Sequence, residues 1–284
     1  MPRYAYRLVN VFGIGDDPFS GNPLCVFEDA RGLRTEQMQA LALQFNLSET
    51  TFILPSTAGD ARARIFTPTV ELAFAGHPTL GTAYVVHTQR ELGTRVRLEL
   101  GVGVVPVTGE GARWTLQAPA SRTRPVAATR GELAELLGIS QSEIAEPALW
   151  VSTGNDQLLV PVTSADALAR CRPDIAGLQR HARVSAGGCI MYVFAALGGD
   201  QVSARLFFNV GNSVVEDPAT GSACANLGGY LIATGASLPL TRDIDQGRAV
   251  GRPSQLRLTV NAEAQIFVTG AVRELGRGVI ELPA

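Results

Sequence analysis

Short runs rich in β-branched and aromatic residues recur along most of the chain and predict many β-strands. Two segments break this pattern. Residues 78–91 and 221–234 are apolar on nearly every side when drawn as helices, and each closely follows a glycine, Gly76 or Gly221. A helix without a polar face has to be covered all round. We therefore predict two central helices, each wrapped by a curled sheet. The predicted strands lie near 4–12, 23–28, 51–54, 62–67, 95–100, 113–118, 148–152, 157–162, 190–196, 202–208, 256–260 and 265–272.

Three pieces of sequence recur in the same order in the two halves of the chain. Each pair combines the same small, polar and apolar residue types, and the shared order makes chance an unlikely source. The pairs are FSGNPLCVF (19–27) with STGNDQLLV (152–160), ARARIF (61–66) with VSARLF (202–207), and AGHPTLGTAYVV (75–86) with TGSACANLGGYL (220–231). Self-similarity of this kind is the mark of a duplicated architecture.

The duplication predicts an α+β fold of two similar domains related by a pseudo-twofold axis, each a β-barrel-like curled sheet around a central helix. We place the N-terminal domain at 1–118 and the C-terminal domain at 130–273. The segment between them, rich in proline and arginine, is expected to be a linker. The tail at 274–284 is expected to pair back onto the first domain.

Composition and charge exclude several classes of protein. The chain is 46% apolar and 18% charged, with a formal net charge of -2. This balance gives no electrostatic footprint for nucleic acid or for an anionic membrane, so neither is expected as a partner. All 24 basic residues are arginine. The absence of lysine excludes a pyridoxal-phosphate enzyme built on a lysine Schiff base and a P-loop with its phosphate-binding lysine.

The N-terminal segment, the cysteines and the histidines give no sign of a targeting segment or of a metal site. The opening MPRYAYRLVNVF reads as a strand, without the apolar core of a signal peptide, and no apolar run is long enough to span a membrane. We therefore expect a cytoplasmic protein. The four cysteines lie far apart and are expected to be buried free thiols. The three histidines are isolated, so no metal and no other cofactor is expected.

The starts of the two apolar helices are the candidate binding site. A helix N-terminus has unpaired backbone N–H groups and a partial positive charge, and it therefore attracts anions. Gly76 and Gly221 allow close approach to the backbone, with polar side chains beside them. If the domains are related by a twofold axis, the two helix starts face one cleft, where they could hold a small carboxylate substrate. The polar residues beside the glycines are His77, Thr79, Thr220 and Ser222.

Two carboxylates near these helix starts are candidates for acid–base chemistry. Glu49 lies in NLSETTFIL, at the entry to a strand, and Asp217 lies in VVEDPATGS, just before Gly221. Glu71 and Glu216 are their rivals. Because a charged residue in such a place is also typical of a solvated turn, the pattern alone does not separate these four.

The segments FSGNPLCVF, NLSETTFIL, RIFTPTVELAFAGHPTLGTA and EDPATGSA resemble the phenazine-biosynthesis PhzF-like isomerase family. The resemblance implies a diaminopimelate-epimerase-like fold and a homodimer. It implies that Glu49 is the acid/base, that His77, Asp217 and Ser222 belong to the site, and that Gly76 and Gly221 offer N–H groups to a substrate carboxylate. Epimerases of this fold use one cysteine at each helix start. This chain has FAGHP and EDPATG there, which excludes a thiol pair.

One carboxylate base next to a carboxylate-binding site favours an isomerase that moves a proton and a double bond in a small carboxylic acid, without a cofactor. A single base can return the proton on the face from which it came. An amino-acid-type epimerase that uses Glu49 with Asp217 on the opposite face is the first alternative. A non-catalytic small-molecule binding protein is the second, and it would have no use for a carboxylate facing a carboxylate ligand.

Overall fold

The chain folds into two compact units, which we describe from a computed structural model that covers residues 1–185 and 187–282. Unit 1 comprises Met1–Gln117 and Thr269–Ala284, and unit 2 comprises Ala118–Val268. The chain therefore returns to unit 1 earlier than residue 274, within the long strand β17 (Ile266–Glu281). Unit 2 begins directly at Ala118, in the segment that was predicted to be a linker.

The elements of unit 1 are mostly strands. They are β1 (Arg3–Val11), β2 (Asn22–Phe27), α1 (Thr35–Phe45), β3 (Glu49–Leu54), β4 (Ala61–Phe66), β5 (Glu71–Leu72), α2 (Gly76–Arg90), β6 (Arg95–Leu100), β7 (Gly103–Glu110), β8 (Arg113–Gln117) and the C-terminal part of β17.

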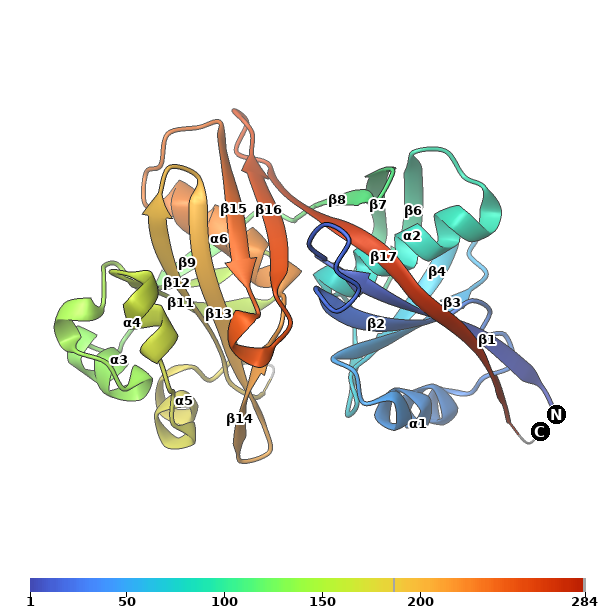
Figure 1. The fold of residues 1–284 in the computed structure, drawn as a ribbon, viewed down its shortest axis with the longest axis horizontal. Coiled ribbons are helices and arrows are strands. Elements are labelled where there is room, and N and C mark those ends of the chain that lie inside the picture. Colours follow the sequence, from blue (N-terminus) through green and yellow to red (C-terminus); the bar gives the residue numbers. More distant parts are fainter. Residues whose placement is uncertain (186, 283–284) are drawn as a thin grey trace. The chain divides into compact units, whose positions relative to one another are not determined.

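The strands of unit 1 close into a barrel. The pairing runs β17–β1–β2–β3–β4–β6–β7–β8 and returns from β8 to β17, and β5 pairs on the side of β4. The β2–β3 and β4–β6 pairs are parallel. Helix α2 packs against seven of these strands and occupies the centre of the barrel (Figure 1). The predicted arrangement of a curled sheet around a central helix is confirmed for this unit.

Helix α2 is buried from its first residue, which explains why it lacks a polar face. Its residues from Gly76 to Ala83 are all buried. Gly81 lies so close to β1 and β2 that a Cβ atom there would be 2.6 Å from Leu24 Cδ2 and 3.0 Å from Val11 Cγ2. The hydroxyl of Thr82 is paired inside the barrel, where it donates to Thr51 Oγ1 at 2.8 Å. Small residues thus let the helix and the strands approach closely.

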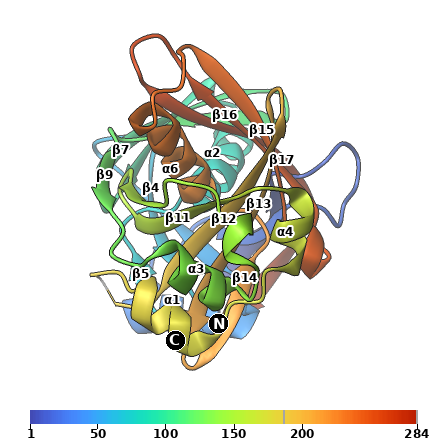
Figure 2. The ribbon, with the colours of Figure 1, turned by 90° about the vertical axis from the view of Figure 1, so that its left-hand side faces the viewer.

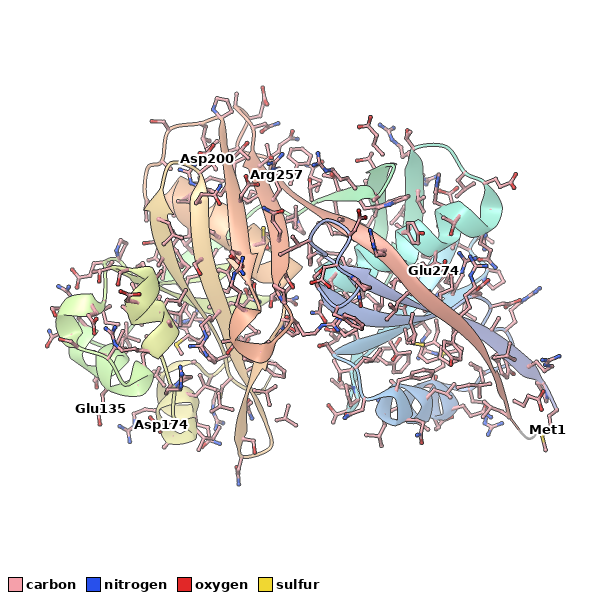
Figure 3. All side chains as sticks on the ribbon, viewed as in Figure 1. Met1, Glu135, Asp174, Asp200, Arg257 and Glu274 are labelled. Atoms are coloured by element: carbon pink, nitrogen blue, oxygen red, sulfur yellow. The ribbon has the colours of Figure 1, made fainter. Side chains whose placement is uncertain are left out.

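Arg7 fixes the other end of the barrel interior. Its guanidinium is buried and bonds Glu28 at 2.8 Å and Thr88 of α2 at 2.9 Å. It also bonds Glu274 of β17, which is labelled in Figure 3, at 3.1 Å. A buried arginine has to be paired, because an isolated charge in the interior is strongly unfavourable. Arg7 therefore ties β1, the end of α2 and the returning strand together.

Unit 2 contains more helices than unit 1. Its elements are β9 (Arg122–Pro125), α3 (Arg130–Leu137), the 3₁₀ turn η1 (Gln141–Glu143), β10 (Leu149–Ser152), β11 (Asp156–Val162), α4 (Ala165–Arg170), α5 (Ile175–His181), β12 (Ile190–Gly198), β13 (Gln201–Val210), β14 (Ser213–Asp217), α6 (Gly221–Ala233), β15 (Leu240–Gln246), the 3₁₀ turn η2 (Arg248–Val250), β16 (Ser254–Val260) and the start of β17.

Unit 2 repeats the topology of unit 1. Its sheet runs β10–β11–β12–β13–β15–β16, with β14 paired on the side of β13, and the β11–β12 and β13–β15 pairs are parallel. Helix α6 packs on this sheet as α2 does in the barrel. Arg257 of β16 forms an ion pair with Asp243 of β15, and Asp200, which precedes β13, forms one with Arg242 of β15; Asp200 and Arg257 are labelled in Figure 3. All three recurring sequence pieces occupy matching elements: β2 and β11, β4 and β13, α2 and α6. The predicted duplication is thus visible in the connectivity.

Helix α3 is an addition of unit 2, whereas α4 and α5 lie between β11 and β12 as α1 lies between β2 and β3. Helices α3, α4 and α5 gather on one side of the sheet over an apolar cluster (Figure 2). Strand β9 pairs with β10 at the sheet edge, which corrects the prediction of a linker there. All four residues of β9 are exposed. An edge strand without buried positions has no alternating pattern, so its sequence looks like a loop.

The chain thus has a mixed α+β fold with a β-barrel and additional strands, in line with the predicted fold class. Of the helices in the described part of the chain, none is both long enough and apolar enough to cross a bilayer.

The close packing of α2 gives a test of the barrel. We expect Gly81→Val to lower the free energy of unfolding by about 2–3 kcal/mol, because the added methyl groups would overlap Leu24 and the valines of β1. Gly93→Val is the matched control, since a Cβ at this exposed glycine meets nothing within 4 Å; we expect a change within about 0.5 kcal/mol. Urea denaturation of the two variants measures both, and equal stabilities would contradict the enclosed position of α2.

Candidate functional site

The first turn of α2 has no side-chain cap in the described structure. Its N-cap residue is Ala75, which has no polar group to accept the N–H groups of the first turn. Pro78 contributes no N–H group. The N–H groups of Gly76 and His77 are therefore the donors that this helix start presents. That Gly76 offers its N–H group to a substrate carboxylate stays a prediction.

Thr79 has a different role from the one predicted. Its side chain is fully buried, and its hydroxyl donates to the carbonyl oxygen of Ala75 at 2.6 Å. The hydroxyl hydrogen of Thr79 is thus bonded within its own helix, as is common for threonine. Thr79 therefore closes the first turn of α2.

Glu49 and His77 lie side by side at this helix start. Glu49 is the first residue of β3, three residues after the left-handed residue Asn46 that ends α1. Its Oε2 lies 3.4 Å from His77 Nε2, slightly longer than an ordinary hydrogen bond. The Glu49 side chain is 16% exposed, whereas that of His77 is 5% exposed. Glu49 is therefore sheltered and still in contact with solvent.

Burial lowers the pKa of His77 to about 3. The imidazole is consequently neutral at pH 7, and its contact with Glu49 joins a carboxylate to an uncharged ring. On the other side of the ring, Asn22 Nδ2 lies 3.5 Å from His77 Nδ1. With an amide donor at Nδ1, the ring proton is placed on Nε2, the nitrogen that faces Glu49.

Asn22 was not among the predicted site residues. It is the asparagine of the recurring Gly-Asn pair, Gly21-Asn22 in unit 1 and Gly154-Asn155 in unit 2. The repeat was used as a sign of duplication only. The recurrence of this pair at the start of β2 and immediately before β11 was the signal that could have identified Asn22.

Asp217 and Thr220 form the start of α6 in unit 2. Thr220 is the N-cap residue, yet its hydroxyl does not cap the helix within the described residues. It donates instead to Asp217 Oδ2 in a short hydrogen bond. Because the usual capping oxygen is engaged elsewhere, no side chain caps the N–H groups of Gly221 and Ser222 at the N-terminal end of α6 within the described residues.

Gln246 fixes the shape of this loop. Its Nε2 donates to the carbonyl oxygen of Asp217 at 3.0 Å and to Thr220 Oγ1 at 3.1 Å, and its Oε1 accepts from the Thr220 N–H at 3.4 Å. The next residue, Gly247, has a φ of 81°, and a Cβ there would lie 2.4 Å from the carbonyl oxygen of Pro218. Nothing in the sequence patterns indicated that Gln246 holds the loop from Asp217 to Thr220.

Ser222 is half-buried at the second position of α6. Its Oγ accepts a hydrogen bond from Gln157 Nε2 at 3.0 Å. The candidate residues thus form two clusters. The cluster in unit 1 consists of Glu49, Gly76 and His77, and the cluster in unit 2 consists of Asp217, Thr220, Gly221 and Ser222.

The two rival carboxylates are held by arginine. Glu71 receives two hydrogen bonds from Arg64, at 2.7 and 2.6 Å, and these lower the pKa of its carboxyl group. Glu216 is paired with the buried Arg205 at 2.7 Å, and the same guanidinium also bonds the carbonyl oxygens of Leu168 and Cys171 near the end of α4. Both glutamates thus stabilise the fold, and they are poor candidates for proton transfer.

The cysteines are free and buried, as predicted. Cys224 lies within α6, and burial raises the pKa of its thiol. A thiol with a raised pKa is a weak nucleophile and a weak base at neutral pH. Among the residues that the structure describes, no three His, Cys, Asp or Glu side chains gather in a way that could hold a metal ion.

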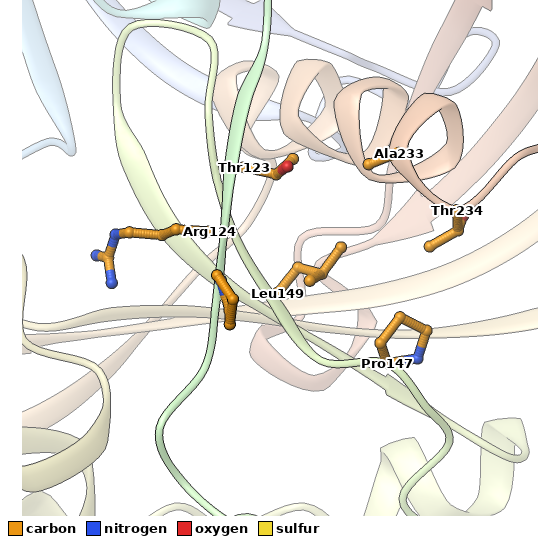
Figure 4. Close-up of a pocket in the computed structure, with 7 residues that line it drawn as sticks. Thr123, Arg124, Pro147, Leu149, Ala233 and Thr234 are labelled. Carbon is orange, nitrogen blue, oxygen red and sulfur yellow. The ribbon is translucent and has the colours of Figure 1, made fainter.

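A pocket of about 410 Å³ in unit 2 is separate from these clusters (Figure 4). It lies at the C-terminal end of α6, whereas the candidate residues lie at the N-terminal end. None of the predicted site residues lines it. The lining residues are Thr123, Arg124, Pro125, Pro147, Leu149, Ala233 and Thr234.

Comparison with known proteins gives consistent matches. The family model of phenazine biosynthesis-like proteins, PhzC-PhzF, matches residues 9–281. The chain is 41% identical to an uncharacterised isomerase of Pasteurella multocida, over 99% of this chain and 95% of that protein. It is 36% identical to the trans-2,3-dihydro-3-hydroxyanthranilate isomerase of Pseudomonas fluorescens, over 98% of this chain and 99% of that enzyme.

Solved structures show the same fold. A PhzF family protein of Bacillus anthracis superimposes with a TM-score of 0.84 at 23% identity, covering 99% of this chain and all of the other. A hydroxyproline epimerase of Agrobacterium vitis gives a TM-score of 0.65 at 13% identity, covering 99% of this chain and 91% of that enzyme. The fold of this chain is therefore shared with a PhzF family protein and with a hydroxyproline epimerase, in line with the fold that the family resemblance implied.

The neutral state of His77 gives a pH prediction. The pKa of His77 is about 3 in the folded chain and about 6.5 in an unfolded one. The unfolded chain thus binds the proton first as the pH falls. The contribution of His77 to the free energy of unfolding should be fully present above pH 6.5 and should decrease by about 1.4 kcal/mol per pH unit below it.

Proton NMR checks this directly. We expect the ring resonances of His77, assigned by their loss in His77→Gln, to stay unchanged between pH 5 and 8. The decrease in stability between pH 6 and 4 should be smaller in His77→Gln than in the unmodified protein. A His77 midpoint between pH 5 and 8 would show that the ring is charged in part of the working range.

Proposed function

The chain belongs to the phenazine biosynthesis-like family and is an isomerase, and we propose that it moves a proton and a double bond in a small carboxylic acid, with Glu49 as the acid/base. The observation that carries this proposal is the position of Glu49, a sheltered carboxylate 3.4 Å from a neutral imidazole. A general base has to change its protonation state in each turnover. A charged imidazolium at that distance would favour the ionised carboxylate and weaken it as a base.

The reaction that one base can perform is a shift within an allylic system. The Glu49 carboxylate removes a proton from carbon, and the electron pair of that C–H bond forms a new double bond to the neighbouring carbon. The π electron pair of the old double bond moves onto the far carbon. That carbon then takes the proton back from the Glu49 carboxyl group. The proton leaves and returns on the same face, so one residue serves as both base and acid.

We propose that the helix starts bind carboxylate groups. The N–H group of Gly221 and the hydroxyl of Ser222 in unit 2 would hold the carboxylate of the substrate, because helix N-termini favour anions, and the N–H group of Gly76 in unit 1 has the same character. The relative in Pseudomonas fluorescens is named for trans-2,3-dihydro-3-hydroxyanthranilate, itself an unsaturated carboxylic acid. The substrate class proposed for this chain is therefore a small unsaturated carboxylic acid.

Asp217 has an orienting role in this proposal. Its Oδ2 accepts the hydroxyl hydrogen of Thr220, and this bond holds the carboxylate against the loop before α6. It follows Glu216, which is paired with the buried Arg205, and it precedes Pro218. The epimerase alternative would require Asp217 to donate a proton from the opposite face. In the structure its Oδ2 is instead engaged as an acceptor for the Thr220 hydroxyl.

The first test concerns Glu49. We expect Glu49→Gln to reduce turnover below detection while changing the dissociation constant by less than about tenfold, or roughly 1.4 kcal/mol. The substitution keeps the shape of the side chain and removes the proton carrier. The assay follows double-bond movement and deuterium incorporation in D₂O for a panel of unsaturated carboxylic acids that includes trans-2,3-dihydro-3-hydroxyanthranilate.

Glu71→Gln is the matched control and should keep its activity, since Glu71 is paired with Arg64 away from this cluster. Full turnover in Glu49→Gln would contradict the proposed mechanism and would favour the alternative of a small-molecule binding protein.

The second test separates isomerase from epimerase. We expect Asp217→Asn to slow turnover while the abstracted hydrogen still exchanges with solvent, because Glu49 remains intact. In an epimerase that uses Asp217 as the opposite-face acid, exchange through Glu49 would survive and inversion of the stereocentre would stop. Deuterium NMR together with chiral chromatography of the product distinguishes the two results.

A further inference from the structure

Two buried amide side chains lie behind Ser222 in unit 2. Gln157 of β11 and Asn226 of α6 are both fully buried. Burial of an amide is unfavourable unless its donors and acceptors are paired. Here they are paired with each other, with the backbone and with Ser222, so they form a continuous chain of hydrogen bonds.

The donor and acceptor roles along this series of hydrogen bonds are set by the backbone. Asn226 Oδ1 accepts the N–H of Thr153 at 2.7 Å, and Asn226 Nδ2 donates to the carbonyl oxygen of Asn155 at 2.9 Å. A backbone N–H can only donate and a carbonyl oxygen can only accept. The amide of Asn226 therefore has one possible orientation, and a flipped assignment would break both bonds.

That orientation passes to Gln157 and then to Ser222. Asn226 Nδ2 also donates to Gln157 Oε1 at 2.9 Å, so the other amide atom of Gln157 has to be its nitrogen. Gln157 Nε2 donates to Ser222 Oγ at 3.0 Å. The hydroxyl of Ser222 is thus an acceptor toward Gln157, and its own hydrogen has to point elsewhere.

The duplicated unit serves as an internal control. In the aligned repeats, Leu24 of unit 1 stands at the position of Gln157, and Gly81 stands at the position of Asn226. Leu24 and Gly81 are in direct apolar contact. The same strand–helix contact is therefore made in unit 1 without any polar group. The fold does not need the two amides, which points to a role in the chemistry at Ser222.

We propose that Asn226 and Gln157 are positioning residues that make Ser222 an obligatory hydrogen-bond donor. The Ser222 hydroxyl then adds a third donor to the N–H groups of Gly221 and Ser222 at the start of α6. Such a set binds a carboxylate oxygen and disfavours a group that has to donate, such as an amide NH₂. This proposal rests on the proposed function, since it assumes that the ligand held here is the substrate carboxylate.

The orientation can be tested without any ligand. Neutron diffraction from perdeuterated crystals locates the deuterium on Ser222 Oγ and on the amide of Gln157. We expect the Gln157 deuterium to point at Ser222 Oγ and the Ser222 deuterium to point away from Gln157. A Ser222 deuterium directed at Gln157, or a reversed amide, would overturn the proposal. Turnover plays no part in this result, so it is independent of Glu49.

The anion preference is tested with a variant that copies unit 1. Gln157→Leu combined with Asn226→Gly places the unit 1 pair in unit 2 and should therefore fold, which thermal unfolding checks. Calorimetry with anthranilate and anthranilamide gives the ratio of their dissociation constants. We expect the unmodified protein to prefer anthranilate at least tenfold and the double variant to lose about tenfold of that preference.

A purely structural role would give a different pattern. If the amides act through Ser222, Ser222→Ala loses the same preference, and adding the double variant to it changes nothing further. Turnover should show a raised KM with little change in kcat, because the carboxylate is held equally in the ground and transition states. Additive losses, or no preference for anthranilate in the unmodified protein, would refute the donor role of Ser222. Loss of turnover in Glu49→Gln alone would leave that conclusion unchanged.

Discussion

When strands enclose a helix from its first residue, water cannot pair with the backbone N–H groups of its first turn. The first N–H groups of α2 and α6 have no partner within the helix, and the apolar surroundings make an unpaired donor unfavourable. In both units the ordinary solution, a capping side chain, is missing from the described structure. Ala75 has no polar group, and the Thr220 hydroxyl is bonded to Asp217. The two helix starts therefore carry donors that suit a bound anion.

The two units apply one frame to two different tasks. Residues at matching positions of the helices differ in kind, with His77 in α2 and Ser222 in α6. The contact beneath them is apolar in unit 1, between Leu24 and Gly81, and polar in unit 2. Unit 1 thereby places a neutral ring beside a carboxylate, and unit 2 gives a hydroxyl a fixed direction. Duplication preserved the backbone while the buried pairs diverged.

Sequence patterns predicted what depends on local apolar content. The two helices without a polar face, the repeat and the buried cysteines all follow from that content, and each is seen in the structure. Strand β9 was missed because an exposed edge strand has no buried positions to set a pattern. The amides Gln157 and Asn226 were missed because a single polar residue in an apolar run gives no indication of its partners.

The candidate site was predicted only as far as residue type allows. Glu49, Glu71 and Glu216 could not be separated, because cross-strand contacts with Arg64 and Arg205 decide which glutamates are neutralised, and register is not readable from composition. Thr79 looked like a ligand of the helix start. Its hydroxyl bonds a carbonyl oxygen of its own helix, a choice that depends on side-chain rotamer rather than on sequence.

The groups that attract the substrate anion also affect how strong a base Glu49 is. A lysine or a charged imidazole beside Glu49 would bind an anionic substrate well, and it would also stabilise the ionised carboxylate and weaken it as a base. The chain has no lysine, and burial keeps His77 neutral. Backbone N–H groups and a directed hydroxyl provide attraction that does not titrate and that is confined to the first turn of each helix. Binding of the substrate anion and basicity of Glu49 are thus supplied by different groups, so that strengthening one does not weaken the other.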